Sequence, residues 1–149
     1  MGEAVMRLYT IGYQGKTLEQ LTQSLVDNKV EVLVDSRQLP WSHKKGFCKS
    51  NLKNAIEKAG IEYAHDSKWG APKALRNELA QAWDYDEFFI GYSKHLDYLN
   101  GNLSDLSDLV REKKACLLCM EAKASECHRS ILAERLKKDF SAGLEIVHL

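Results

Sequence analysis

The chain has 149 residues, of which 44% are hydrophobic and 28% are charged, as is usual for one globular domain that buries its own core. Its 21 basic and 21 acidic residues cancel, which argues against a general electrostatic attraction to nucleic acids or membranes. Four cysteines are too few for a dense disulfide framework, and because no apolar run resembles a signal peptide or a membrane span, we expect a cytoplasmic protein with reduced thiols.

The N-terminal half alternates short apolar runs with amphipathic stretches. Thr17 and Gln20 have the spacing of a capping box, which predicts a helix that starts after Thr17. A second helix is expected over 50–59, with Gly60 as its C-terminal stop. The apolar runs predict three strands, over 5–11, 31–34 and 61–65.

The C-terminal half begins with two or three helices. One is expected to start at a capping box formed by Asp84 and Glu87 and to stop near Asn100 and Gly101, and another covers about 103–113. The helix that starts at Asp84 has apolar residues at helical spacing, which are predicted to be core: Phe88, Phe89, Tyr92, Leu96 and Leu99. The remaining elements expected are a strand over 115–119, a helix over 129–140 and a strand over 144–149.

Strands separated by helices predict an α/β fold. We expect a single domain over 1–149, a three-layer sandwich in which a mainly parallel sheet of about five strands carries helices on both faces. In such a sheet the C-terminal ends of the strands share one edge, where ligands bind. The ends of the predicted strands are polar or backbone-permissive: Gly12-Tyr13-Gln14, Asp35-Ser36-Arg37, His65-Asp66 and Cys119-Met120-Glu121.

The cysteines admit several interpretations. Cys116 and Cys119 match a CxxC spacing, but residues three apart on a strand point to opposite faces, so we interpret Cys116 as a small buried hydrophobe. Cys119, Cys127 and His128 could ligate a metal if Glu121, His65 or a water completed the set. Their spacing matches no standard zinc ribbon or finger, and we predict no metal and no cofactor.

Cys127 is the better candidate for a catalytic thiol. It precedes a predicted helix and neighbours His128 and Arg129, and a helix N-terminus and adjacent cations favour a thiolate. Cys119 is the second candidate nucleophile, with Glu121 or a histidine moving protons. In the alternative interpretation, Cys127 packs inward while His128 and Arg129 form hydrogen bonds across the strand ends.

Arg37 and Arg129 both fall on the predicted ligand-binding edge, where paired guanidinium groups suit a phosphate or a carboxylate. Asp35 and its neighbour Ser36 belong to the same candidate site, although for Asp35 we favour an internal salt bridge that fixes the loop. The glycine at position 12, before Tyr13, permits close approach of a ligand to the backbone. A tight strand-to-helix turn would explain a glycine at this position equally well.

The segment 37–53 offers a different kind of contact. It has no acidic residue, and its stretch 41–47 interleaves Trp41 and Phe47 with basic residues, a composition used to stack and neutralise nucleotides. A solvated loop with both aromatic rings packed on the body explains the same pattern.

Four motifs together resemble the domain-of-unknown-function family 488. They are the strand end at Thr10-Ile11-Gly12, the turn at Val34-Asp35-Ser36-Arg37, Cys119-x-Glu121 and Cys127-His128-Arg129. The resemblance covers nearly the whole chain and implies a compact α/β domain, without an established activity.

We therefore expect an enzyme that acts on a phosphorylated or otherwise anionic, nucleotide-like small molecule. In this hypothesis Arg37 and Arg129 bind the anion, Cys127 or Cys119 supplies the thiol, and Glu121 or His128 moves the proton. The alternative is a nucleic-acid-binding module that makes short single-stranded contacts through 37–53, with structural cysteines.

Overall fold

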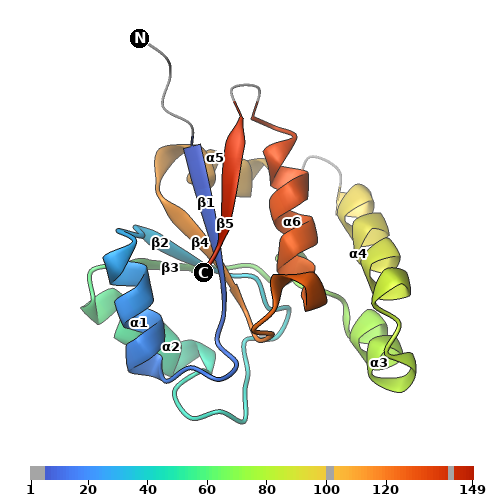
Figure 1. The fold of residues 1–149 in the computed structure, drawn as a ribbon, viewed down its shortest axis with the longest axis horizontal. Coiled ribbons are helices and arrows are strands. Elements are labelled where there is room, and N and C mark those ends of the chain that lie inside the picture. Colours follow the sequence, from blue (N-terminus) through green and yellow to red (C-terminus); the bar gives the residue numbers. More distant parts are fainter. Residues whose placement is uncertain (1–5, 100–102, 141–142) are drawn as a thin grey trace.

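One sheet of five parallel strands organises the computed structural model, which describes residues 6–99, 103–140 and 143–149 (Figure 1). The strands are β1 (Met6–Gly12), β2 (Val32–Asp35), β3 (Glu62–His65), β4 (Ala115–Cys119) and β5 (Leu144–His148). Their spatial order is β3-β2-β4-β1-β5, and all four pairings are parallel. The predicted α/β class is confirmed; position 5 of the first predicted strand lies outside the described residues.

Six α-helices occur in the described ranges, and none is long and apolar enough to cross a membrane. They are α1 (Leu18–Asp27), α2 (Lys49–Lys58), α3 (Lys73–Ala82), α4 (Tyr85–Leu99), α5 (Ser104–Glu112) and α6 (His128–Lys137), with short 3-10 turns η1 (Ser67–Trp69) and η2 (Ala124–Glu126). The Thr17–Gln20 capping box is confirmed in both directions, and the Asp84 side chain accepts from the backbone of Glu87. The expected stop of α4 at 100–101 lies outside the described residues.

Helices cover both faces of the sheet, as expected for a three-layer sandwich. Alternating strand residues supply the two cores, since successive side chains on a strand point to opposite faces. Helices α1 and α2 pack on the face that carries Ile11, Leu33 and Leu118, whereas α4, α5 and α6 pack on the face that carries Leu8 and Leu117 (Figure 1).

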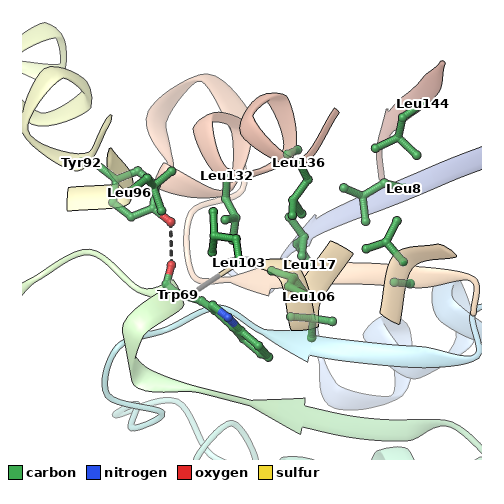
Figure 2. Close-up of a cluster of buried hydrophobic side chains, with 14 of the residues drawn as sticks. Leu8, Trp69, Tyr92, Leu96, Leu103, Leu106, Leu117, Leu132, Leu136 and Leu144 are labelled. Atoms are coloured by element: carbon green, nitrogen blue, oxygen red, sulfur yellow. Dashed lines mark hydrogen bonds between the residues drawn. The ribbon is translucent and has the colours of Figure 1, made fainter. Parts of the chain in front are cut away.

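The predicted apolar stripe of α4 belongs to the second core. Phe88, Tyr92 and Leu96 are buried there. Tyr92 also donates a 2.6 Å hydrogen bond to the carbonyl of Trp69, which ties α4 to the turn after β3 (Figure 2). This contact satisfies a buried hydroxyl inside an otherwise apolar layer.

The connections from β1 and β4 leave the sheet in opposite directions. From β1 the chain passes through α1 on one face toward β2, and from β4 it passes through α6 on the other face, beyond β1, to β5 (Figure 1). Adjacent strands whose crossovers diverge in this way form a topological switch point, the usual place for a site in an open α/β sheet.

Candidate functional site

The switch point brings the C-terminal ends of β1 and β4 into direct contact. Beyond Gly12, the Tyr13 amide donates to the carbonyl of Cys119 at 3.1 Å and the Gln14 amide to that of Met120 at 2.8 Å. A Cβ atom at Gly12 would lie 1.7 Å from the carbonyl oxygen of Glu121. The close approach expected at this glycine is therefore made by the chain's own backbone.

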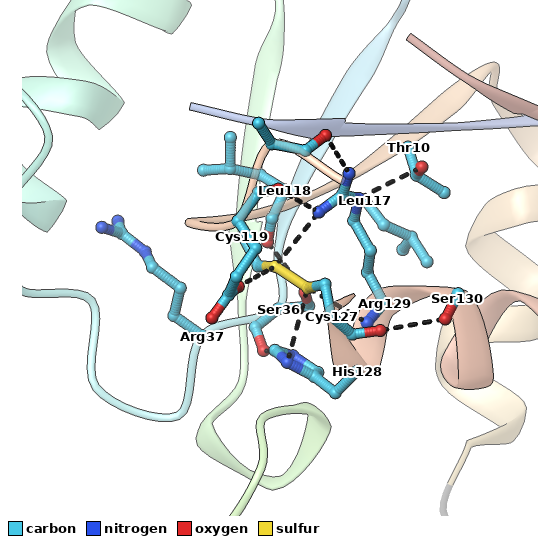
Figure 3. Close-up of a disulfide and its surroundings, with 12 residues drawn as sticks. Thr10, Ser36, Arg37, Leu117, Leu118, Cys119, Cys127, His128, Arg129 and Ser130 are labelled. Atoms are coloured by element: carbon cyan, nitrogen blue, oxygen red, sulfur yellow. Dashed lines mark hydrogen bonds between the residues drawn. A yellow bond between two sulfur atoms is a disulfide. The ribbon is translucent and has the colours of Figure 1, made fainter. Parts of the chain in front are cut away.

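Cys119 and Cys127 are joined by a disulfide at this position (Figure 3). Cys119 ends β4, the turn η2 reverses the chain, and Cys127 is the N-cap of α6, which brings the two side chains together. The expectation of reduced thiols is thus wrong for this pair. Cys48 and Cys116 are free, and Cys116 is fully buried in the core that faces α1 and α2, as predicted.

Arg129 is the largest fully buried side chain in the described ranges. Its guanidinium donates to the Thr10 hydroxyl at 3.2 Å, to Cys119 Sγ at 3.5 Å and to the carbonyl oxygens of Glu121 at 2.5 Å and Ala122 at 3.2 Å (Figure 3). Burial lowers the pKa of Arg129. Its hydrogen bonds all go to hydroxyl, sulfur and carbonyl atoms, and the nearby charge of the Glu121 carboxylate partly offsets the effect of burial on its pKa.

His128 bridges the start of α6 to the end of β2. Its Nε2 lies 2.8 Å from the carbonyl oxygen of Ser36, and its Nδ1 lies 3.8 Å from Cys127 Sγ. A carbonyl can only accept, so Nε2 carries the proton. Burial is the main cause that lowers the pKa of His128 to about 4, which makes the ring neutral at physiological pH.

Ser36 serves the same junction through its backbone and side chain. Its hydroxyl donates to the carbonyl of Leu118 at 2.8 Å, and its amide donates to the same oxygen at 3.0 Å. Both Ser36 and Leu118 are fully buried. In this structure Ser36 therefore fixes the end of β2 against β4.

Asp35 forms the internal salt bridge expected for it. Its carboxylate receives Arg37 Nε at 2.8 Å and Nη2 at 2.6 Å, and the Tyr63 hydroxyl at 2.5 Å. Burial alone would lower the pKa of Arg37, but the hydrogen bonds and charge of Asp35 raise it overall. The remaining Nη1 of Arg37 donates to the carbonyl of Phe47 at 2.6 Å.

The two arginines do not form an open pair. The Arg37 guanidinium points away from the disulfide that Arg129 contacts (Figure 3). Each guanidinium already meets internal acceptors on Nε, Nη1 and Nη2. The geometry therefore assigns both side chains to holding loops at the sheet edge.

Glu121 is the half-buried carboxylate nearest to the sulfurs. Its Oε2 lies 3.2 Å from Cys119 Sγ, a distance at which it can exchange a proton with the thiol of the reduced form. Burial is the main cause that raises the pKa of Glu121. A carboxyl with a raised pKa is better matched to acid–base work near neutrality than an exposed one.

The basic segment adjoins this edge through one of its aromatic rings. Phe47 is buried and stacks on Tyr13 with ring centroids 4.6 Å apart, and Lys44 Nζ lies 5.6 Å from the Phe47 ring. Trp41 is 55% exposed and meets His43 edge-on. The two aromatic residues thus differ: Phe47 packs on the body and Trp41 faces solvent.

Sequence reasoning missed Tyr63 as a site residue, and it quoted Thr10 only as part of the family resemblance. Thr10 is a fully buried polar residue inside an apolar strand, and its hydroxyl receives Arg129 and also lies 2.5 Å from His148 Nδ1. Tyr63 stands on β3, beside Leu33 of β2, and reaches Asp35. A polar residue in a run that should be wholly buried was the available signal for Thr10.

The fold and this edge define an α/β protein with a disulfide and a neutral histidine at the switch point of a doubly wound parallel sheet. The family model described as "Domain of unknown function DUF488" matches residues 17–136, and the chain belongs to this family. No significant match was found among curated proteins or solved structures.

Proposed function

We propose that the protein is an enzyme of thiol–disulfide exchange, with Cys119 and Cys127 as its active pair and an anionic small-molecule thiol as its substrate. The main support for this proposal is the pair of N–H donors that contact the two sulfur atoms. Arg129 Nη1 lies 3.5 Å from Cys119 Sγ, and the Arg129 amide, at the N-terminus of α6, lies 3.4 Å from Cys127 Sγ. Such donors stabilise sulfur as a thiolate, which is both the nucleophile and the leaving group of exchange.

The exchange steps follow from these positions. A substrate thiolate attacks Cys127 Sγ, the sulfur–sulfur bond breaks, and Cys119 leaves as a thiolate beside the Arg129 guanidinium. Glu121 then supplies a proton to Cys119. A second substrate thiolate attacks the substrate sulfur of the mixed disulfide and releases Cys127 as a thiolate. The two protons that the substrate thiols lose to solvent return to Cys127 and Glu121, so two substrate thiols become one disulfide while the protein gains two electrons and two protons.

Access and charge decide which thiols react. Both cysteines are buried, so a substrate reaches Cys127 only when the largely exposed segment between β4 and α6 moves aside. The exposed bases Lys45, Lys49 and Lys53 lie on the acid-free segment that adjoins the sheet edge through Phe47 and would favour an anion. In this proposal these lysines replace Arg37 and Arg129 as the anion-binding groups.

A cytoplasmic location is compatible with the proposed exchange activity, because cytosolic disulfides are usually transient and catalytic.

Two probe thiols of opposite charge test the proposal. Oxidised protein is expected to form a mixed disulfide on Cys127 with mercaptoethanesulfonate about tenfold faster than with cysteamine, measured by mass spectrometry at low salt. Replacing Lys45 and Lys49 by glutamate should remove most of this preference.

The control is Cys48→Ser, which removes a free cysteine outside the pair and should leave both rates unchanged. A pair that does not exchange with either thiol in the folded protein would contradict the proposed function. Equal rates for the two thiols would contradict only its anionic substrate.

A nucleic-acid-binding module remains the second candidate because Trp41 is exposed beside His43 in the basic segment. It predicts that Trp41→Ala weakens binding to a fluorescent single-stranded oligonucleotide by about 1–3 kcal/mol, with steep salt dependence. Binding should be unaffected by Cys127→Ser. Fluorescence anisotropy that detects no binding at low salt would remove this candidate.

A further inference from the structure

Three side chains at the switch point present ligand atoms to one another. One atom each from Cys119, Cys127 and His128 lies within 4.8 Å of the other two, and all three residues are buried. We propose that the reduced protein binds a divalent cation of the zinc class through the two thiolates and the imidazole of these residues. Thiolate sulfur and imidazole nitrogen are the ligands that zinc prefers.

The orientation of His128 fits a metal ligand. Because Nε2 carries the proton that faces the carbonyl of Ser36 at 2.8 Å, Nδ1 presents its lone pair on the side of the sulfurs, 3.8 Å from Cys127 Sγ. Histidine ligands usually donate their other ring N–H to a carboxylate or a backbone carbonyl, which fixes the tautomer and the ring plane. Here Ser36, itself bonded to Leu118 of β4, supplies that carbonyl.

The backbone separation of the cysteines also suits a shared metal. Their Cα atoms are 7.5 Å apart, whereas most disulfides span about 4.4–6.8 Å. Tetrahedral zinc with Zn–S distances of about 2.3 Å holds its sulfurs about 3.7 Å apart. The wide Cα separation would allow the two sulfurs to move apart to that spacing after reduction.

The proposed binding depends on the redox state. A dithiol reductant transfers two electrons and two protons to the Cys119–Cys127 bond and becomes a cyclic disulfide itself. The cation then replaces the two thiol protons, which pass to solvent. Three protein ligands leave a fourth position for a water, as in catalytic rather than structural zinc sites. Oxidation of the pair would release the ion.

This inference goes beyond the exchange activity and does not depend on it, since a metal-bound pair would be protected from exchange. The test adds Zn²⁺ to reduced full-length protein under anaerobic conditions and measures uptake against a chromophoric chelator. We expect about one Zn²⁺ per chain for the reduced protein and none for the oxidised protein.

Variants identify the ligands. Cys127→Ser and His128→Gln should each weaken Zn²⁺ binding at least tenfold, whereas Cys48→Ser, which removes a free cysteine outside the cluster, should bind as the unmodified protein does. Co²⁺ bound to the reduced protein should show a thiolate charge-transfer band in the near ultraviolet that Cys127→Ser loses.

A protection experiment avoids any loss of folding in the variants. In reduced wild-type protein, Zn²⁺ should slow iodoacetamide labelling of Cys119 and Cys127 while Cys48 reacts at an unchanged rate. Equal labelling of the pair with and without Zn²⁺, or equal Zn²⁺ uptake by oxidised and reduced protein, would overturn the metal site. Either result would leave the exchange activity to be judged by its own probe thiols.

Discussion

Replacing Asp35 with alanine is expected to destabilise the protein by about 3–5 kcal/mol, because it leaves the buried Arg37 guanidinium without its counter-charge. Asp35 is fully buried and Arg37 is 7% exposed, so solvent cannot replace the lost carboxylate. The Tyr63 hydroxyl would also lose its acceptor. Urea unfolding followed by circular dichroism measures the change in the free energy of unfolding.

Two variants separate the orphaned charge from the lost hydrogen bonds. Tyr63→Phe removes one hydrogen bond to the same carboxylate and should cost only about 1.5 kcal/mol. Adding Arg37→Met to Asp35→Ala removes the orphaned cation, so the double variant should be about 2 kcal/mol more stable than the sum of the two single changes. A strictly additive double variant would mean that the ion pair is not what stabilises this edge.

The strands of the sheet could be predicted from the hydrophobic pattern of the sequence. Short apolar runs located all five strands, and Thr17 and Gln20 located the start of α1. Parallel pairing followed from the helical connections. The strand order did not follow. Strand β4 inserts between β1 and β2, which are joined by only the 19 residues 13–31, and local patterns carry no record of such a long-range pairing. Helix α6 ends at Lys137, before the predicted position 140.

The site shows where sequence reasoning stops. The convergence of residues 12, 35–37, 119 and 127–129 at one edge could be predicted from strand ends alone. The bonding partners of these side chains could not be predicted. Four cysteines allow three complete pairings as well as free thiols, and only the turn η2 decides that Cys119 meets Cys127. An arginine near a helix start predicts an open anion ligand. The guanidinium of Arg129 is instead buried, and it donates to Thr10 of β1 and to the carbonyl oxygens of Glu121 and Ala122, which follow β4.

Replacing Gly12 with alanine is the second change for which we expect a large effect, a destabilisation of about 3 kcal/mol. The new methyl carbon would lie 1.7 Å from the carbonyl oxygen and 2.5 Å from the carbonyl carbon of Glu121. Both are backbone atoms, so no side-chain rotation relieves the clash. Overpacking that forces the backbone to shift has a free-energy cost at the upper end of the usual range for overpacking. Urea unfolding again measures the change.

Gly15→Ala is the matched control, because it adds the same methyl group three residues further along the chain. Gly15 has φ +79° and no atom within 4 Å of the added carbon, so alanine there should cost only about 1 kcal/mol of backbone strain.

The Gly12→Ala change has a second consequence, since the Glu121 carbonyl oxygen that it displaces accepts a hydrogen bond from Arg129 Nη1 at 2.5 Å. The guanidinium also donates to Cys119 Sγ, so Gly12→Ala should alter the rate of thiol exchange while Gly15→Ala leaves it unchanged. Equal losses of stability in the two variants would show that the ends of β1 and β4 are not held in the close contact on which the site depends.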